Sequence, residues 1–402
     1  METLKVYFLM GPVDCNDANI PHYSDDFLKE LSGTLGIRVE NGTLEEVAAQ
    51  ALPIFFIASG GAEMGFMSSY HAAKPPYILL TTPAYNSLAA AMEIMGYLDE
   101  QGEPGEILHG SVETIAKRLS VLLRVANAKK KISGMRLGAI GKPSGLIASE
   151  ADSAKLKAAS GMEIVDIALD ELVQEYYKGG YVENDLTREL KSQGYAAEEI
   201  EKALNVYGAT CRVMERYNLQ AVTVRCFELL GLIHTTGCLA LAILNAEGIP
   251  AACEGDTKSL ASMVILNAIT GQSSFMANPS CMDAETSEII FAHCTLPIDM
   301  PDRYRLTTHF ESGIGVAVAG EIALGKVTVF KCNDDLSRHY AGRAELLECP
   351  NRADLCRTQM RLKMLDGVEY FARGPISNHH MIVKGDWASE IDEFFRSIRT
   401  GE

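Results

Sequence analysis

The sequence has no apolar run that approaches the roughly 18 to 20 residues of a membrane-spanning helix. Its most apolar stretch, residues 240–252, is interrupted by Asn245 and Glu247. The chain starts Met-Glu-Thr-Leu-Lys and runs directly into a strand-like segment at residues 6–10, without the basic start and cleavage site of a signal peptide. We therefore predict a cytoplasmic protein with no membrane partner.

Basic residues are also scarce. The chain has 36 Lys and Arg against 53 Asp and Glu, which gives a formal net charge of -17. This excess of negative charge disfavours sequence-independent binding to nucleic acid. We expect small molecules or metal ions as ligands and no nucleic-acid partner.

Several cysteine and nucleotide motifs are missing. Ten cysteines are spread along the chain without a Cys-x-x-Cys pair, so we predict reduced, mostly buried thiols and argue against a zinc-thiolate site. The loop at residues 141–145, Gly-Lys-Pro-Ser-Gly, opens a strand-loop-helix unit but has neither the Rossmann glycine fingerprint nor the Walker lysine pattern. A nucleotide cofactor is therefore not expected.

The length and the hydrophobic periodicity predict the domain plan. A chain of 402 residues, 47% apolar and 22% charged, is too long for one simple core, and we expect two or three domains. Residues 1–130 alternate buried-strand patterns with amphipathic helical patterns, which is typical of a parallel α/β domain. The predicted strands are 6–10, 53–58 and 77–81, and the predicted helices are 87–97 and 112–128.

A second α/β domain is predicted over residues 131–270, after a lysine run and a Ser-Gly break. Its predicted elements are strands at 135–140, 221–226 and 249–253 and helices at 196–217, 236–247 and 260–269. From residue 271 to 402, short β-rich runs are separated by Gly, Pro and Asp, with no helix expected before 388–398. The fold class is thus two doubly wound parallel α/β domains followed by a β-rich, antiparallel barrel-like or sandwich domain.

Acidic residues follow the predicted strand 249–253, where open α/β sheets place functional loops. Glu254 comes directly after the strand and next to a glycine, so it is a candidate metal ligand or general base. Asp256 precedes an apolar helical run, which favours a helix N-cap.

Histidines occur at two further strand ends. His379 and His380 precede the strand-like run 381–383, and adjacent residues of a strand point to opposite faces, so at most one of them faces a given site. His293 ends an apolar strand and is either a hydrogen-bonded core histidine or a third member of the site. Histidine and carboxylate together are typical ligands of Mn²⁺ or Mg²⁺ sites.

Four blocks in order resemble the superfamily of L-fucose isomerase and L-arabinose isomerase. They are Cys-Glu-Gly-Asp-Thr-Lys at 253–258, Gly-Gln-Ser-Ser-Phe-Met-Ala-Asn at 271–278, Ala-His-Cys at 292–294 and His-His at 379–380. The resemblance implies an aldose-ketose isomerase that works through a cis-enediol and depends on Mn²⁺ or another divalent cation such as Mg²⁺ or Co²⁺. It also implies a homo-oligomer, a trimer or hexamer.

The resemblance also implies roles for individual residues. Glu254 matches the first acid/base glutamate, which is also a metal ligand. The second acid falls on Asn278, whose amide can offer an oxygen to a metal but cannot accept a proton. Either Asp283 replaces it as the second catalytic acid, or one carboxylate works with a metal-bound water, or the alignment is shifted. The last metal ligand falls on His379 or His380, and we favour His380.

Three further residues are expected to hold the substrate: Arg225, Lys258 and His293. The last matches a metal-ligand histidine of the arabinose-type enzymes, so its role stays open. The chain is shorter than either enzyme type, so the sugar does not carry over. A sulfonated hexose such as sulfoquinovose is one candidate, and it would call for an Arg or Lys at the sulfonate.

Two other functions are also consistent with the sequence. Paired α/β layers and a missing second acid also fit a non-catalytic intracellular sugar-binding or sensor protein. A metal-dependent aldolase or epimerase would use the same enediolate chemistry. The leading hypothesis is the isomerase, since the four blocks and the domain plan both favour it.

Overall fold

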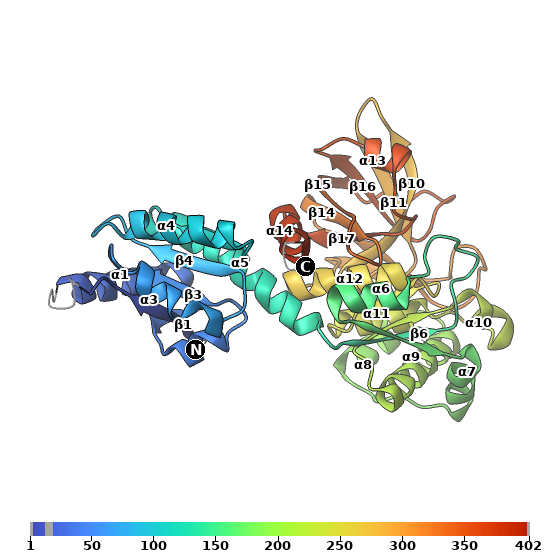
Figure 1. Ribbon diagram of the computed structural model, residues 1–402. Coiled ribbons are helices and arrows are strands. Elements are labelled where there is room, and N and C mark those ends of the chain that lie inside the picture. Colours follow the sequence, from blue (N-terminus) through green and yellow to red (C-terminus); the bar gives the residue numbers. More distant parts are fainter. Residues whose placement is uncertain (1–2, 13–18, 400–402) are drawn as a thin grey trace. The chain divides into compact units, whose positions relative to one another are not determined.

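The computed structural model describes residues 3–12 and 19–399. The chain divides into two compact units, each described by itself: one holds the described residues up to Lys130 and those from Arg396 on, and the other spans 131–395. Two parallel sheets with flanking helices and a closed antiparallel barrel make up the fold (Figure 1). These elements confirm the predicted fold class, while the domain boundaries stay a prediction.

The first unit is built on a parallel five-stranded sheet in the order β2-β1-β3-β4-β5. The strands are β1 (Thr3–Leu9), β2 (Arg38–Asn41), β3 (Ile54–Ile57), β4 (Tyr77–Thr81) and β5 (Gly105–Leu108). The helices are α1 (Asn19–Leu35), α2 (Leu44–Ala48), α3 (Glu63–Met67), α4 (Ser87–Glu100), α5 (Val112–Ile132) and the short 3-10 helix η2 (Tyr70–Ala72). The predicted strands and helices are present. Helices α1, α2 and α3 and strands β2 and β5 were not predicted, and the two strands, which have partly exposed residues, lack an apolar run.

Helices cover both faces of this sheet because its strands are apolar on both sides. Phe55 and Phe56 are consecutive in β3 and therefore point to opposite faces. Phe56 packs in a core with residues of α1 and α5, and Phe55 packs in a second core with residues of α3 and α4. This is the doubly wound arrangement that the near-continuous hydrophobic strands indicate.

The second unit begins with a parallel sheet in the order β7-β6-β8-β9. Its strands are β6 (Arg136–Ile140), β7 (Glu163–Ile167), β8 (Ala221–Val224) and β9 (Ala251–Cys253). Its helices are α6 (Ser153–Ser160), α7 (Leu169–Lys178), α8 (Asp185–Ser192), α9 (Ala197–Tyr217), α10 (Phe227–Leu232), α11 (Cys238–Ala246) and α12 (Thr257–Thr270). The chain leaves β6 toward β7 on one side and returns to β8 on the other, so the carboxyl ends of β6 and β8 form the switch point at which such sheets bind ligands.

The barrel closes in the order β10-β11-β16-β15-β14-β17. Its strands are β10 (Phe275–Asp283), β11 (Glu288–His293), β14 (Gly325–Cys332), β15 (His339–Glu348), β16 (Thr358–Met364) and β17 (His380–Lys384). A separate two-stranded sheet pairs β12 (Arg303–Thr307) with β13 (Ala317–Glu321), and the helices are α13 (Glu369–Arg373) and α14 (Ala388–Arg399). Short β-rich strands dominate this region as predicted, but the short helix α13 was not anticipated.

Helix α12 connects the second sheet to the barrel. It packs against β9 on one side and against β14 and β17 on the other. The backbone N–H of Cys332 in β14 donates a hydrogen bond to Ser262 Oγ of α12 at 3.2 Å. Glu254 and Asp256 come just before α12, so they lie at the junction between the second sheet and the barrel.

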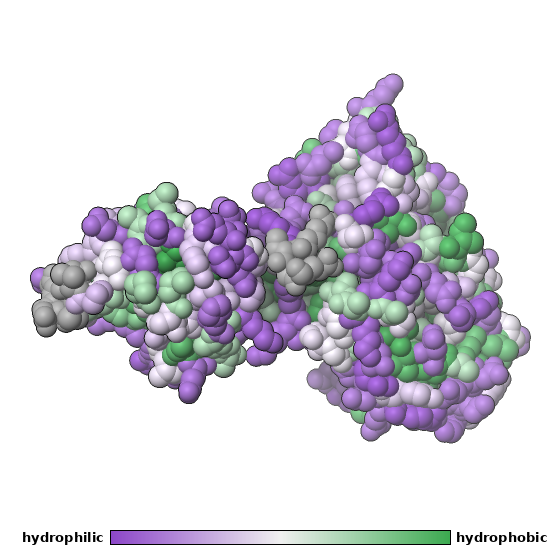
Figure 2. Space-filling model, in the orientation of Figure 1, coloured by the Kyte–Doolittle hydropathy of each residue, from purple (hydrophilic) through white to green (hydrophobic). Residues whose placement is uncertain are grey.

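The surface is mostly hydrophilic on the face shown in Figure 2, with apolar residues in scattered patches. This matches a composition with 53 acidic and 36 basic residues. Among the described residues, none of the helices combines the length and hydropathy that crossing a bilayer requires. The nine described cysteines are free and only Cys281 is exposed, in line with the predicted thiols, while Cys15 lies outside the described residues.

Candidate functional site

A strained turn after β9 sets the direction of the Glu254 side chain. Glu254 has a φ of 62° and Gly255 a φ of 68°, both in the left-handed region that a glutamate rarely adopts. A Cβ atom on Gly255 would lie 2.7 Å from the carbonyl oxygen of Lys142, so only glycine fits there. The Ser144 backbone N–H donates to the Glu254 carbonyl at 3.0 Å and holds the turn in place. Strain of this kind is concentrated at functional sites.

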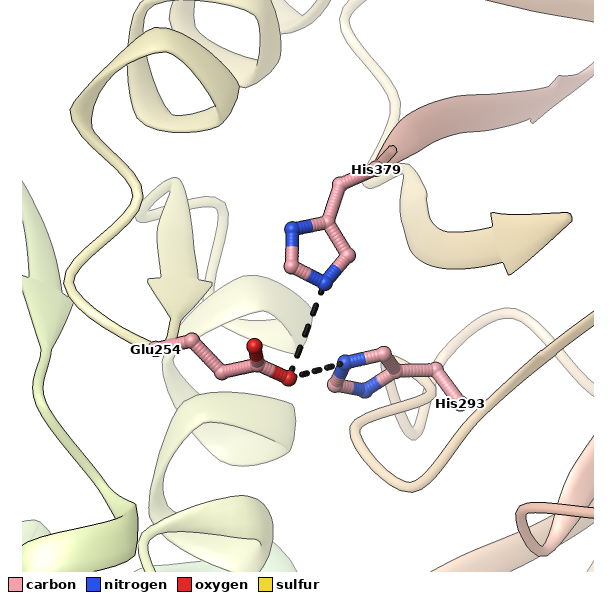
Figure 3. Close-up of side chains that lie close together, drawn as sticks. All are labelled: Glu254, His293 and His379. Carbon is pink, nitrogen blue, oxygen red and sulfur yellow. Dashed lines mark ion pairs between the residues drawn. The ribbon is translucent and has the colours of Figure 1, made fainter. Parts of the chain in front are cut away.

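Glu254 meets two histidines that are far from it in the sequence. Its Oε1 atom lies 3.4 Å from His293 Nε2 and 3.6 Å from His379 Nε2 (Figure 3). His293 ends β11, and His379 immediately precedes β17. The side chains of Glu254, His293 and His379 are 13%, 6% and 0% exposed. The structure therefore assembles one carboxylate and two imidazoles at the carboxyl end of β9, facing the barrel.

The carboxylate of this cluster and the imidazole of His379 shift each other's pKa values. Burial by itself raises the pKa of Glu254, but the nearby imidazoles of His293 and His379 outweigh it and hold that pKa below its ordinary value. Burial also lowers the pKa of His379, but Asp256 and Glu254 raise it above its usual value. Glu254 is therefore an anion at neutral pH.

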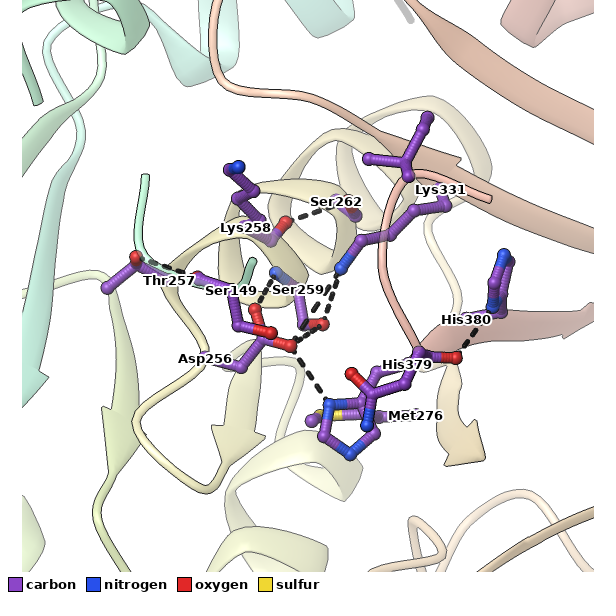
Figure 4. Close-up of polar contacts among 12 residues, drawn as sticks. Ser149, Asp256, Thr257, Lys258, Ser259, Ser262, Met276, Lys331, His379 and His380 are labelled. Atoms are coloured by element: carbon purple, nitrogen blue, oxygen red, sulfur yellow. Dashed lines mark hydrogen bonds and ion pairs between the residues drawn. The ribbon is translucent and has the colours of Figure 1, made fainter. Parts of the chain in front are cut away.

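Each imidazole is oriented by a partner on its far side. His379 Nδ1 donates to Asp256 Oδ2 at 2.9 Å, since the carboxylate can only accept (Figure 4). His379 Nε2 then faces Glu254, and it is buried without a hydrogen-bond partner among the described residues. His293 Nδ1 likewise pairs with Thr295 Oγ1 at 2.9 Å. In both residues the Nε2 atom is the one turned toward the carboxylate.

Asp256 is held by more than His379. It is the N-cap of α12 and accepts a hydrogen bond from the Ser259 N–H at 2.7 Å, as its position before the helix predicted. Lys331 of β14, fully buried, places Nζ 3.9 Å from Asp256 Oδ2 and 2.7 Å from Ser259 Oγ. Burial raises the pKa of Asp256, but Lys331 first and then His379 bring it below its usual value. The carboxylate is therefore ionised and shared between a lysine and a histidine.

The cluster fits a divalent cation. One ligand atom from each of Glu254, His293 and His379 lies within 4.8 Å of the others. An orphaned, buried Nε2 on His379 is what a ligand histidine presents before it binds. Histidines whose other nitrogen bonds a carboxylate or hydroxyl are typical of metal sites, because that bond fixes the tautomer and the ring orientation. One oxygen and two imidazole nitrogens suit a first-row divalent ion.

His380 lies on the opposite face of its strand from this cluster. It is fully buried inside the barrel, where Nε2 pairs with the Tyr370 hydroxyl at 3.0 Å and Nδ1 with the Asn378 carbonyl at 2.9 Å. Burial, with a smaller contribution from Lys331, lowers its pKa to about 3. The two histidines thus point in opposite directions, as their adjacency predicted, and His379 is the one that joins Glu254.

The two residues considered for the second acid are not brought to Glu254. Asn278 Oδ1 accepts a hydrogen bond from Asn378 Nδ2 at 2.9 Å. Asp283 ends β10 at the hairpin turn, where it is exposed and accepts from the Glu285 N–H at 2.8 Å. Backbone N–H groups of Thr286 and Glu285 lower the pKa of Asp283, as in an ordinary turn. Among the described residues, Glu254 is the one carboxylate that belongs to the metal-binding group.

The remaining predicted residues lie beside the cluster. Lys258 is in the first turn of α12, and Figure 4 shows its amino group pointing away from His379. Arg225 follows β8 directly and forms an ion pair with Glu228, with 2.5 Å between Nε and Oε1. Sequence reasoning missed Lys331, Ser259 and Thr295. For Lys331 the available signal is a lysine between the apolar residues Phe330 and Cys332 of strand β14.

Comparison with known proteins identifies the class of activity. No family model matches the chain. A sulfoquinovose isomerase from Alkalicoccus urumqiensis is 24% identical over 336 residues, which cover 77% of this chain and 74% of that protein. A sulfoquinovose isomerase from Clostridium sp. (strain MSTE9) is 25% identical over 341 residues, covering 77% and 72%. These relatives confirm the prediction of a sugar isomerase enzyme, while the fucose and arabinose isomerase superfamily stays a prediction.

Solved structures add nothing to this. D-threo-3-hydroxyaspartate dehydratase from Delftia sp. HT23 aligns over 96% of this chain and 84% of that chain at 14% identity, with a TM-score of 0.15. Its C353A mutant in the metal-free form also gives a TM-score of 0.15. Values this low do not support a shared fold, and we infer nothing from them.

Proposed function

We propose that the chain is a metal-dependent aldose-ketose isomerase that acts on a sulfonated hexose such as sulfoquinovose. The observation that carries this proposal is the cluster of Glu254, His293 and His379. The Nδ1 atom of each imidazole is held by a hydrogen bond, so that Nε2 faces the carboxylate. The two sulfoquinovose isomerases that resemble the chain support the reaction and the substrate class.

Glu254, His293 and His379 would hold Mn²⁺ or another divalent cation such as Mg²⁺ or Co²⁺. We place His379 in this set in preference to His380, since its Nε2 faces Glu254 and has no other partner. When bound, the cation polarises the sugar carbonyl and makes the neighbouring carbon-bound proton more acidic. Asp256 can only accept a hydrogen bond, so it keeps the His379 ring in the tautomer whose Nε2 lone pair is free, and Thr295 orients the His293 ring.

Glu254 moves the proton. Isomerisation takes a proton from C2 of the open-chain aldose and returns one to C1, while a hydroxyl proton passes from O2 to O1, so no oxidant is consumed. Glu254 is ionised at neutral pH and can accept the C2 proton, although its low pKa makes it a weak base that needs an activated substrate. Asn278 cannot accept a proton. We therefore propose that Glu254 alone carries the proton across one face of the cis-enediol.

The test is proton exchange in heavy water followed by NMR. Protein treated with a chelator is incubated with sulfoquinovose or glucose, with and without added Mn²⁺. Ketose formation that requires the metal, with deuterium at C1 of the ketose, supports the proposal. Glu254→Gln should abolish turnover, while the matched variant Asp283→Asn should retain it.

Other outcomes assign the other functions. Loss of turnover in Asp283→Asn would indicate that Asp283 is the second catalytic acid. An epimer or a cleaved product would identify an epimerase or an aldolase instead. Sugar binding without deuterium incorporation in any condition would overturn the enzymatic proposal in favour of a sensor.

A further inference from the structure

Arg225 and Glu254 lie at the ends of two neighbouring strands. Val224 of β8 and Cys253 of β9 are partners in the parallel register. The residues that follow them are Arg225 and Glu254, so the two backbones leave the sheet side by side, about 5 Å apart. The Glu254 side chain turns toward His293 and His379, whereas Arg225 packs against Gly141 and Glu228.

The loop after β6 joins these two positions. Ser144 donates its N–H to the Glu254 carbonyl at 3.0 Å and its hydroxyl to Glu228 Oε2 at 3.1 Å. Gly141 has a φ of 79°, and a Cβ there would lie 2.7 Å from the Arg225 Cβ. Glycine therefore allows Arg225 to lie against the end of β6, at the switch point of the sheet.

A hollow opens beside Arg225. Its volume is about 710 Å³, and its wall includes Gly141, Arg225 and Glu228 with Phe227 and Leu232 of α10. This size is in the range of small-molecule sites. The hollow offers apolar side chains next to one arginine, which is the chemistry that a carbon chain ending in an anion requires.

The Arg225 guanidinium is incompletely paired. Its Nε lies 2.5 Å from Glu228 Oε1 but is buried without a hydrogen bond of acceptable geometry, and no described residue accepts a hydrogen bond from its Nη groups. Arg343, in contrast, uses both Nε and Nη2 to bind Asp366. The Arg225 side chain is 35% exposed, so its outer edge can be reached from the hollow.

We propose that Arg225 binds the sulfonate group of the substrate, while Glu254 acts at C1 and C2. This inference rests on the proposed function. A sulfonate is a permanent anion with three oxygens, and a guanidinium can donate two parallel hydrogen bonds to two of them. A six-carbon chain reaches between neighbouring strand ends. Glu228 is the counter-ion of Arg225 in the absence of substrate and repels the sulfonate.

The experiment uses the Mn²⁺-loaded protein and two open-chain alcohols that cannot isomerise: the sulfonated hexitol obtained by reducing sulfoquinovose, and the plain hexitol. Calorimetry gives the Kd of each for the parent chain, Arg225→Met, Glu228→Gln and the control Arg303→Met, an exposed arginine paired with Glu321. Arg225→Met should weaken binding of the sulfonated hexitol by about 10- to 100-fold, the size of a lost charged hydrogen bond. Glu228→Gln should strengthen it, and Arg303→Met should leave it unchanged.

Steady-state kinetics separates this inference from the proposed function. If the parent chain isomerises sulfoquinovose and Arg225→Met does so with the same KM, the sulfonate site is overturned and the isomerase stands. If no sugar is isomerised but the sulfonated hexitol still binds more tightly than the plain one through Arg225, the isomerase fails and the sulfonate site stands. A weakening by Glu228→Gln equal to that of Arg225→Met would indicate a merely structural ion pair and would also overturn the inference.

Discussion

The imidazole of His379 donates a hydrogen bond from Nδ1 to the Oδ2 atom of Asp256 at 2.9 Å, and both side chains are fully buried. In the proposed function, Asp256 acts through His379 and not on the substrate. We therefore expect a positioning residue whose substitution changes metal binding.

Asp256→Asn should weaken Mn²⁺ binding by about 10- to 100-fold, the usual effect of losing a partner behind a ligand histidine. Asparagine is as good an N-cap as aspartate, so α12 should stay intact. Calorimetric titration of metal into the apoprotein measures the change. The control is Asp354→Asn, an exposed carboxylate paired with Arg352. Equal affinities of Asp256→Asn and the parent would contradict the assigned role.

Lys331→Met should destabilise the fold by about 3 kcal/mol, because it leaves the buried Asp256 carboxylate without its cation. Burial lowers the pKa of Lys331, and Asp256 opposes that effect. The double variant Lys331→Met with Asp256→Asn should lose less than the sum of the single variants, since both charges are then gone. Urea unfolding of the four proteins gives this comparison, and strictly additive losses would show that the two groups do not interact.

His379 and His380 can be separated by substitution. His379→Ala should reduce Mn²⁺ affinity by more than the roughly 10- to 100-fold expected for a supporting partner. His380→Phe should retain the metal and lose the hydrogen bonds to the Tyr370 hydroxyl and the Asn378 carbonyl, about 1 kcal/mol of stability each. Manganese EPR titration and thermal unfolding measure these two effects. Loss of metal binding in His380→Phe but not in His379→Ala would indicate that His380 is the ligand.

A charge cluster on α7 and α9, in which Glu175 is buried, predicts acid sensitivity. The hydrogen bond from Lys178, supported by those from Arg212 and Arg216, lowers the pKa of Glu175 to about 2 from 4.5. A group whose pKa is depressed in the folded state stabilises that state above its unfolded pKa, and the effect is lost as pH falls from about 4.5 to about 2.

Glu175→Gln should therefore cost about 2 kcal/mol at pH 7, and its difference from the parent should shrink through that acid range. Denaturant unfolding at several pH values tests this. Glu311→Gln, an exposed carboxylate, is the control. A difference that does not depend on pH would mean that the Glu175 charge contributes nothing.

Periodicity was enough to predict the elements that bury continuous apolar runs. Strands β1, β3, β4, β6, β8 and β9 and the position of Glu254 after β9 follow from such runs. Alternation also predicted that His379 and His380 would face opposite ways. Short, half-exposed strands such as β2 carry no comparable pattern.

The partners of the site could not be predicted in the same way. Lys331 approaches Asp256 only because β14 packs on α12, and the hydrogen bond between Lys331 and Ser259 joins residues 72 positions apart. Choosing His379 over His380 also required the register of β17 against β10. The local pattern predicts that neighbouring residues take opposite faces, but not which of the two faces meets Glu254.

The left-handed turn at Glu254 has a consequence for protein engineering. Glycine at position 254 would relieve the backbone strain, so a screen for thermal resistance alone should select Glu254→Gly and lose the carboxylate proposed to move the proton. A selection that also requires turnover should instead retain Glu254 and find its stabilising substitutions at other positions. At position 254, glycine thus favours stability, whereas the proposed activity requires glutamate.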